Sequence, residues 1–296
     1  MADKSKIQRT ESTWNVVTGC TKISDGCVNC YITGTPPFRM AGRKFDGPGI
    51  GASTGVTLHP DRLEMPLRWK QPRMVFVNSL ADLFHEDVPT EYIAQVFAVM
   101  ALASRHTFQV LTKRHARLRA LLNSRHFHLA VLARTLHLQD DNHLPPWNPA
   151  TRTLTKWPLP NVHVGVSVET QQWADIRIPA LLDTLAAVRW ISAEPLLGPV
   201  QLRSEWVGDG PSLSWAVVGG ESGVGARPMD LAWARSLVRQ CQLTKTPAFV
   251  KQLGSVYAKD LFVGGRSLYA QGDRKGGDWT HWPTDLRVRE HPLTDG

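Results

Sequence analysis

Short apolar runs, each ending in polar residues or glycine, recur along the chain and predict seven β-strands. The runs cover residues 14–17, 74–77, 108–111, 162–166, 189–191, 215–218 and 248–250. Apolar runs of this length, bounded by polar residues, are typical of strands that are buried on both faces.

Helical patterns lie between several of these runs. Apolar residues recur at helical spacing in residues 91–103, 116–122, 127–138, 172–185 and 231–240. Strands that alternate with helices indicate parallel pairing and an α/β fold. We expect a (β/α) TIM-type barrel, complete or partial, in which the polar residues after each strand face one site. An open doubly wound sheet is the main rival, and its ligands gather at one switch point.

Two segments fall outside the strand and helix repeat. Residues 140–160 are rich in Pro, Trp and Asn and have no periodicity, which predicts an insertion loop. Residues 256–296 carry two Gly-Gly pairs and a strand-like run at 286–290. We therefore expect a barrel over residues 1–255 and a C-terminal cap or extension over residues 256–296.

Composition favours a globular cytoplasmic protein. The 296 residues are 42% hydrophobic, which is enough for a large core. The N-terminus has no apolar segment of the kind found in signal peptides, and no run approaches the roughly 20 apolar residues of a membrane span. With four cysteines and no sign of secretion, a disulfide framework is not indicated.

Charge is spread unevenly along the chain. The formal net charge is +8, yet residues 105–134 contain no acid and several arginines and histidines. This stretch predicts contacts with the phosphates of DNA or RNA, with Arg114, Arg117 and Arg119 as candidates. Eleven tryptophans would provide stacking surfaces for unpaired bases. The alternative is a basic helix face that is simply solvated.

Three cysteines within eleven residues form the most specific chemical motif. Cys20, Cys27 and Cys30 have the spacing C-x6-C-x2-C in a loop after the first predicted strand. A [4Fe-4S] cluster held by three cysteines keeps one iron open for a substrate or cofactor. The alternative is a structural zinc site, which needs a fourth ligand such as Cys241 or a histidine.

Polar side chains at the predicted strand ends are further candidates. Lys113 and Arg114 follow the third strand and would offer positive charge to a phosphate or carboxylate. Ser167, Glu169 and Glu194 would bind ribose hydroxyls or an amine, and buried ion pairs with basic neighbours are their alternative. Asp82, His85 and Glu86 would serve as metal ligands or, with Asp87, as the polar start of a helix.

Eight longer motifs resemble one known family. They are TWNVVTGCTKISDGCVNCY, VFVNSLADLFHEDVP, VLTKR, VGVSVETQ, ISAEPLLGPV, VVGGESGVGARPMD, VKQLG and WPTDLRVRE. Together these motifs resemble the phage-associated family of three-cysteine-motif proteins, described as radical-SAM-like. The likeness extends over nearly the whole chain and implies a barrel, a [4Fe-4S] cluster and S-adenosylmethionine (SAM).

The resemblance also has departures. The common radical SAM spacing is C-x3-C-x2-C with an aromatic residue before the last cysteine, whereas Tyr31 here follows Cys30. Gly219, Gly220 and Glu221 resemble the segment that holds the SAM amino group, but they follow about the sixth strand instead of the second. A tight turn whose acid pairs with an arginine is the alternative for Glu221.

These inferences converge on a radical-SAM-like enzyme that modifies or repairs a nucleic acid or nucleotide. The candidate catalytic residues are Lys113, Glu169, Glu194 and Lys251, and the candidate cofactor-binding residues are Asn78, Ser167, Gly219, Gly220 and Glu221. Two other functions stay open. One is a non-catalytic, metal-stabilised nucleic-acid-binding protein, and the other is a radical SAM enzyme that acts on a small metabolite.

Overall fold

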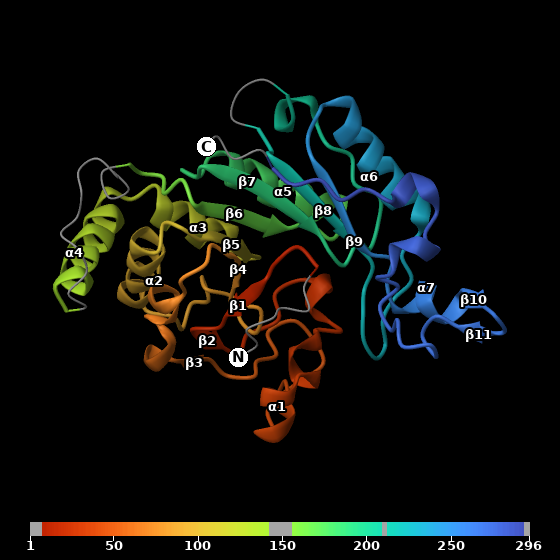
Figure 1. The fold of residues 1–296 in the computed structure, drawn as a ribbon, viewed down its shortest axis with the longest axis horizontal. Helices are drawn as coiled ribbons and strands as arrows, with labels where there is room; N and C mark the ends of the chain where they lie inside the picture. Colours follow the sequence, from red (N-terminus) through yellow and green to blue (C-terminus); the bar gives the residue numbers. More distant parts are fainter. Residues whose placement is uncertain (1–7, 142–155, 209–211, 293–296) are drawn as a thin grey trace. The chain divides into compact units, whose positions relative to one another are not determined.

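The computed structural model of the protein describes residues 8–141, 156–208 and 212–292. Seven strands form one sheet in the order β1-β4-β5-β6-β7-β8-β9 (Figure 1). Their bounds are Ser12–Trp14 (β1), Met74–Val77 (β4), Thr107–Thr112 (β5), Val162–Ser167 (β6), Val188–Ala193 (β7), Trp215–Gly219 (β8) and Ala248–Gln252 (β9). The pairings β1–β4, β4–β5, β7–β8 and β8–β9 are parallel.

Six of the seven predicted strands are therefore present within two residues of their predicted bounds, the first shares only Trp14 with its prediction, and the α/β class is confirmed. Among the described residues the strand order ends at β1 on one side and at β9 on the other, as in the partial form of the predicted barrel. The chain divides into two compact units. Unit 1 comprises residues 1–21, 53–165 and 183–188, and unit 2 comprises residues 22–52, 166–182 and 189–296.

Unit 1 has a helical core beside its strands. It contains α2 (Thr90–Leu102), α3 (His115–Leu122) and α4 (Arg125–Asp141), and the short antiparallel pair β2 (Val17–Thr18) and β3 (Thr57–Leu58). Helix α2 packs against α4, where the ring centroids of Phe97 and Phe127 are 5.6 Å apart. Nine of the thirteen residues of α2 are buried, which explains why its sequence is apolar on nearly every side.

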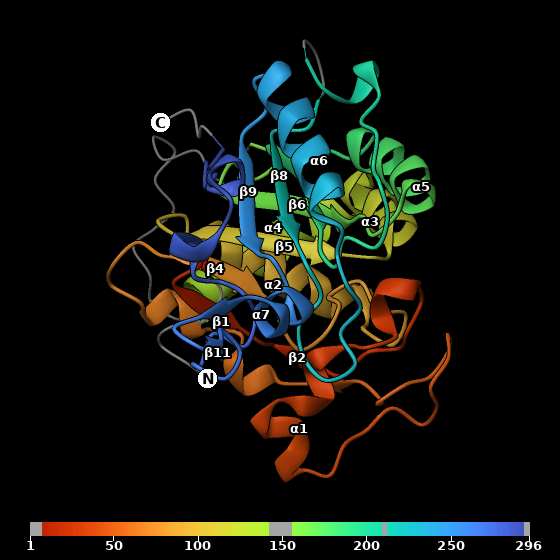
Figure 2. The same ribbon diagram turned by 90° about the vertical axis from the view of Figure 1, so that its right-hand side faces the viewer.

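Unit 2 contains the remaining helices. They are α1 (Pro36–Met40), α5 (Gln171–Leu182), α6 (Leu231–Leu243) and α7 (Ser255–Asp260), followed by the hairpin β10 (Phe262–Val263) and β11 (Arg266–Ser267). Helix α6 packs along β8 and β9 (Figure 2). Trp190 and Trp215 are fully buried, with ring centroids 5.3 Å apart, and form an aromatic core.

The first strand ends earlier than predicted. β1 stops at Trp14, and the backbone N–H groups of Val16 and Val17 donate to Oδ1 of Asn78 at 3.0 and 3.1 Å. Asn78 itself has a positive φ of 56°. Val16 and Val17 therefore leave the seven-stranded sheet, because the side chain of Asn78, and not a neighbouring strand, accepts the hydrogen bonds of their backbone N–H groups.

The C-terminal residues also differ from the prediction. The expected strand over residues 286–290 is replaced by a short 3₁₀ helix, Thr284–Leu286, and a single antiparallel bridge between Arg289 and Phe249. Val250 N donates to Val288 O and Glu290 N donates to Ala248 O, each at 2.8 Å. Residues 288–290 run along β9, but the 3₁₀ helix before them leaves too few extended residues for a strand.

Most of the predicted insertion at 140–160 lies outside the described residues. Helix α4 extends to Asp141, and the described residue Trp157 packs on Phe97 at a ring-centroid distance of 6.0 Å. In the parts of the chain that the structure describes, no helix has the length and apolar character needed to cross a membrane.

Candidate functional site

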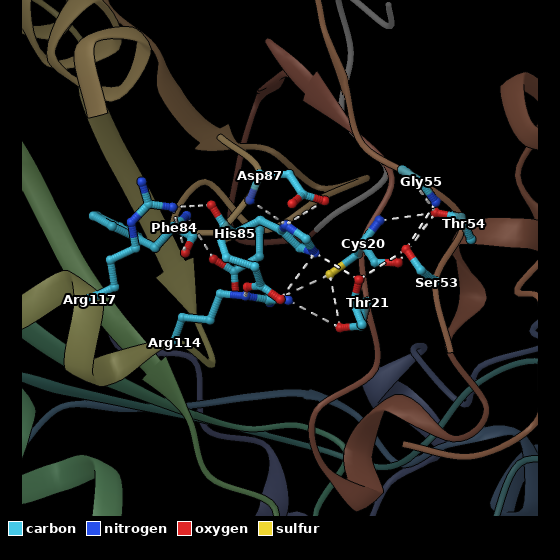
Figure 3. Close-up of polar contacts among 12 residues, drawn as sticks. Cys20, Thr21, Ser53, Thr54, Gly55, Phe84, His85, Asp87, Arg114 and Arg117 are labelled. Atoms are coloured by element: carbon cyan, nitrogen blue, oxygen red, sulfur yellow. Dashed lines mark hydrogen bonds and ion pairs between the residues drawn. The ribbon is translucent and has the colours of Figure 1, made fainter. Parts of the chain in front are cut away.

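Cys20 lies in unit 1, two residues after β2. Its backbone is fixed by Thr54, whose Oγ1 accepts from Cys20 N at 3.0 Å and whose N donates to Cys20 O at 3.1 Å. The half-buried thiol lies 3.7 Å from Nη1 of Arg114 (Figure 3). A guanidinium this close favours the thiolate form, which is the form that binds metals.

Arg114 is held by the acids of its own unit. Its Nη1 lies 3.2 Å from Oδ2 of Asp82, and its Nε donates to Oε2 of Glu86 at 2.8 Å. Its Nη2 donates to Thr21 O at 3.3 Å (Figure 3). Burial disfavours the charge, but Asp82 and Glu86 raise the pKa of Arg114 above its ordinary value. Arg114, which was predicted to bind a ligand phosphate, thus forms ion pairs with two carboxylates of the protein and faces Cys20.

Asp82 fixes the turn after β5. Its carboxylate accepts hydrogen bonds from Thr112 Oγ1 at 2.7 Å, from Lys113 N at 3.0 Å and from Phe84 N at 3.0 Å. The interpretation of residues 82–87 as a polar helix start is wrong, because the N-cap of α2 is Pro89, with no side-chain cap. Glu86 instead pairs with Arg114.

His85 is buried beside the same cluster. Its Nε2 lies 2.8 Å from Thr21 Oγ1, and its Nδ1 accepts from Asp87 N at 3.1 Å. Burial, and then the charge of Arg114, lower the pKa of His85. The imidazole is therefore a neutral group that orients Thr21, the residue next to Cys20.

Cys27 and Cys30 lie in unit 2 on consecutive tight turns. Cys27 ends a 3₁₀ helix, Asp25–Cys27, and Cys30 immediately precedes a second one, Tyr31–Gly34. Cys27 N donates to Ser24 O at 2.8 Å, and Cys30 N donates to Cys27 O at 3.2 Å. The Ser24 hydroxyl lies 3.7 Å from the sulfur of Cys27.

Lys22 supports this segment from within. Only 5% of Lys22 is exposed, and its Nζ donates to Val28 O at 3.1 Å and to Pro48 O at 2.9 Å. The ammonium also lies 4.6 Å from the ring centroid of Phe45. This lysine was not predicted as a site residue, because only its position between two cysteines distinguishes it in the sequence.

Glu169 follows β6 and is fully buried. Its Oε2 lies 2.7 Å from Nη1 of Arg177, and its Oε1 accepts from the Ser24 hydroxyl at 2.8 Å. Arg177 also donates to the carbonyl of Ser167 at 2.9 Å. The two predicted site residues Ser167 and Glu169 therefore share one buried cation, which the strand-end pattern did not identify because it lies within α5.

Glu221 forms an ion pair with an arginine, which was the alternative to its predicted role in SAM binding. Its carboxylate binds Arg227, with Nη2 to Oε1 at 2.6 Å, and accepts from Nδ2 of Asn29 at 3.0 Å. Burial favours the neutral acid, but the hydrogen bonds from Arg227 and Asn29 hold the pKa of Glu221 below its usual range. Asn29 directly precedes Cys30, so Glu221 binds the residue next to this cysteine.

Glu194 and Lys251 pair at neighbouring strand ends in unit 2. Their side chains are each 16% exposed, with Lys251 Nζ 2.5 Å from Glu194 Oε1. A methyl group added to Gly219 would lie 3.3 Å from Cγ of Glu194, and one added to Gly220 would lie 2.4 Å from Leu253 O. The two glycines thus allow close approach of this pair and of the loop after β9.

The remaining predicted residues have separate positions in unit 1. Asn78 holds the turn after β1, and Arg117 donates to the carbonyls of Phe84, His85 and Val88. Arg119 is exposed and pairs with Asp183 at 3.2 Å. Arg117 is thus a structural donor as well as a basic residue.

One protein family matches almost the whole chain. The family model described as "Protein of unknown function (DUF5131)" matches residues 4–283. The chain belongs to this family. None of the curated proteins matches this DUF5131 protein.

Two solved structures, both of spore photoproduct lyase mutants, are similar to the DUF5131 protein. They are 11% and 10% identical to it, with TM-scores of 0.41 and 0.42. Each match covers 85% of this chain and 58% of the other, so the chain spans about three fifths of the length of those lyase chains.

The thiols of this DUF5131 protein have the donor chemistry of a thiophilic metal centre. Cys20, Cys27 and Cys30 are half-buried, and the sulfurs of Cys20 and Cys27 have polar neighbours in Arg114 and Ser24. Cys241 is buried in α6, and burial raises the pKa of its thiol to about 12. Among the described residues, no three His, Cys, Asp or Glu side chains form a group that would hold a metal ion. The complete ligand set stays a prediction from the sequence motif.

Proposed function

We propose that this DUF5131 protein is a radical-SAM-like iron–sulfur enzyme that modifies or repairs a nucleic acid or nucleotide. The observation that carries the proposal is the motif C-x6-C-x2-C, whose three half-buried thiols lie within eleven residues that follow β2. The polar neighbours of Cys20 and Cys27 support it further, because such contacts tune thiolate ligands.

Cys20, Cys27 and Cys30 would hold the cluster, and an iron without a cysteine ligand would take SAM. When bound, the reduced cluster supplies the electron that cleaves a carbon–sulfur bond of SAM. The protein's own groups bind and orient the reactants and exclude water.

Glu194 and Lys251 are the strongest candidates for contact with SAM or the substrate. Their ion pair is partly exposed, so either member can exchange its partner for a ligand carboxylate, amine or hydroxyl. Gly219 and Gly220 permit a ligand to approach the backbone beside them. Glu169 has no exposed surface, and its carboxylate lies against Arg177 and Ser24. We therefore place Glu194 and Lys251, ahead of Glu169, at the reacting groups.

The basic residues of α3 and α4 support a nucleic-acid substrate. Arg119 and Arg125 are exposed, and no acid occurs in residues 105–134. Each phosphate that a Lys or Arg side chain neutralises makes the slope of log affinity against log salt concentration more negative by about one.

Metal analysis of anaerobically purified protein tests the cluster. We expect brown protein with about four irons per chain, and SAM cleavage after reduction. Changing Cys20, Cys27 or Cys30 to Ala should remove the iron, whereas the matched variant Cys241→Ala should keep it. Colourless, zinc-loaded protein that never cleaves SAM would overturn the proposal in favour of a structural metal site.

Fluorescence anisotropy with labelled single-stranded DNA and RNA tests the substrate class. Arg119→Gln with Arg125→Gln should weaken binding and reduce the salt slope, while Arg235→Gln, which alters an exposed pair with Asp285, should not. Arg117 is left intact because it holds three backbone carbonyls. Equal binding by all variants would favour a small-metabolite substrate.

A further inference from the structure

The segment at residues 22–30, which carries Cys27 and Cys30, is fastened within unit 2 at three points. Lys22 binds two carbonyls near its start, Ser24 binds Glu169 in its middle, and Asn29 binds Glu221 near its end. The partners of these anchors come from three different parts of the sequence. The middle anchor has the tightest geometry.

Glu169 is held rigidly at this middle anchor. Both Glu169 and Arg177 are fully buried, and their side chains meet at 2.7 Å. The guanidinium of Arg177 also lies 4.0 Å from the ring centroid of Trp173. A carboxylate fixed in this way has little freedom to move when a neighbouring group presses on it.

Gly26 lies directly against this carboxylate. A methyl group added to Gly26 would be 2.4 Å from Cγ and 2.4 Å from Oε1 of Glu169. Real Cβ atoms do not approach other heavy atoms so closely, and the fixed carboxylate cannot give way. The turn Asp25–Cys27 therefore fits Glu169 only with glycine at its centre.

Two backbone bonds transmit this fit to the cysteines. Cys27 N donates to Ser24 O, and Cys30 N donates to Cys27 O. The conformation of Ser24 therefore sets the position of Cys27, and Cys27 sets that of Cys30. Through Ser24 and Gly26, the fixed carboxylate controls both turns.

We propose that Glu169 is a positioning residue that fixes the turns of Cys27 and Cys30 before any metal binds. The inference rests on the proposed function in that a thiophilic metal is the ligand for which the two thiols are prepared. A preformed ligand pair loses less conformational freedom on binding than a flexible one.

Hydrogen exchange of the metal-free protein tests this role. In Gly26→Ala and in Ser24→Ala we expect the amides of Cys27 and Cys30 to exchange about tenfold faster than in the parent protein. Alkylation of these two thiols by iodoacetamide under native conditions should accelerate as well. The urea midpoint of Ser24→Ala should stay near that of the parent, because its Glu169–Arg177 pair is intact.

Gly198→Ala is the matched control. A methyl group at Gly198 meets only the side chain of Thr170, at 4.0 Å, and Thr170 is the residue after Glu169. We expect this variant to exchange like the parent. If Gly26→Ala does not fold, Ser24→Ala decides the question alone.

Exchange within about twofold of the parent in Ser24→Ala would overturn the inference, because the Glu169–Arg177 pair would then serve the core alone. The result does not depend on the cluster. Protein that contains no iron but shows the faster exchange contradicts the proposed function and keeps the positioning role. Iron-loaded protein whose Ser24→Ala variant exchanges like the parent supports the proposed function and contradicts the positioning role.

Discussion

The guanidinium of Arg114 lies 3.7 Å from the sulfur of Cys20, and both belong to unit 1. The same guanidinium binds Asp82 and Glu86, so its position is set by the fold. A fixed positive charge beside a thiol stabilises the thiolate without a mobile partner.

Arg114→Gln should lower the free energy of unfolding by about 3 kcal/mol, because Asp82 would remain buried without its cation. Urea unfolding followed by circular dichroism measures this loss. Arg119→Gln alters an exposed ion pair and should cost less than about 1 kcal/mol. Equal losses in the two variants would contradict the structural role of Arg114.

His163 predicts a pH dependence of stability. It is buried in β6, and among the described residues neither ring nitrogen has a hydrogen-bond partner. Burial lowers its pKa from 6.5 to about 4. The unfolded chain therefore binds a proton that the folded protein refuses, and stability falls as the pH decreases from 6.5 towards 4.

The full difference in the pKa of His163 corresponds to about 3 kcal/mol. In His163→Leu, urea unfolding should show a correspondingly smaller loss of stability between about pH 7 and about pH 4. His163→Leu with the same pH dependence as the parent protein would assign the effect to other groups.

Glu194→Gln and Lys251→Met should reduce SAM cleavage about a hundredfold, because each variant removes one charged group from the proposed ligand contacts. The free energy of unfolding should fall as well, by about 3 kcal/mol, since each side chain of the pair is only 16% exposed. Steady-state assays of iron-loaded protein measure the activity. Arg203→Gln, which alters an exposed pair with Asp175, is the control. Full activity in both strand-end variants would remove them from the site.

Gly220→Ala should lower the thermal unfolding midpoint. Its methyl group would press on the carbonyl of Leu253, a backbone group that cannot rotate away, at a cost of about 1–3 kcal/mol. Gly34→Ala meets no described atom within 4 Å and should be neutral. A midpoint for Gly220→Ala that equals the parent's would show that the loop after β9 moves easily.

The strands were predictable because burial on both faces leaves continuous apolar runs in the sequence, as at residues 162–166 and 215–218. Helices α2 to α6 were predictable because apolar residues recur in them at helical spacing, with boundaries shifted by a few residues, whereas the short helices α1 and α7 were not predicted. The run at 286–290 misled because a lone strand-like pattern does not show whether a 3₁₀ turn precedes it.

The candidate site was less predictable than the fold. Glu221 pairs with an arginine and Glu194 with a lysine, and such ion pairs were the alternatives to the ligand-binding roles predicted for these acids. The contacts of Ser24 and Gly26 with Glu169 join residues more than 140 positions apart in one chain. A single sequence carries no pattern for such a contact, because neither periodicity nor spacing records which loop meets which strand end.

The backbone of residues 288–290 occupies hydrogen-bonding groups of β9, which ends the strand order. An uncovered edge strand offers a template on which other chains can add, and proteins commonly cover such edges. Residues 288–290 thus leave fewer backbone groups of β9 open to a strand from another chain.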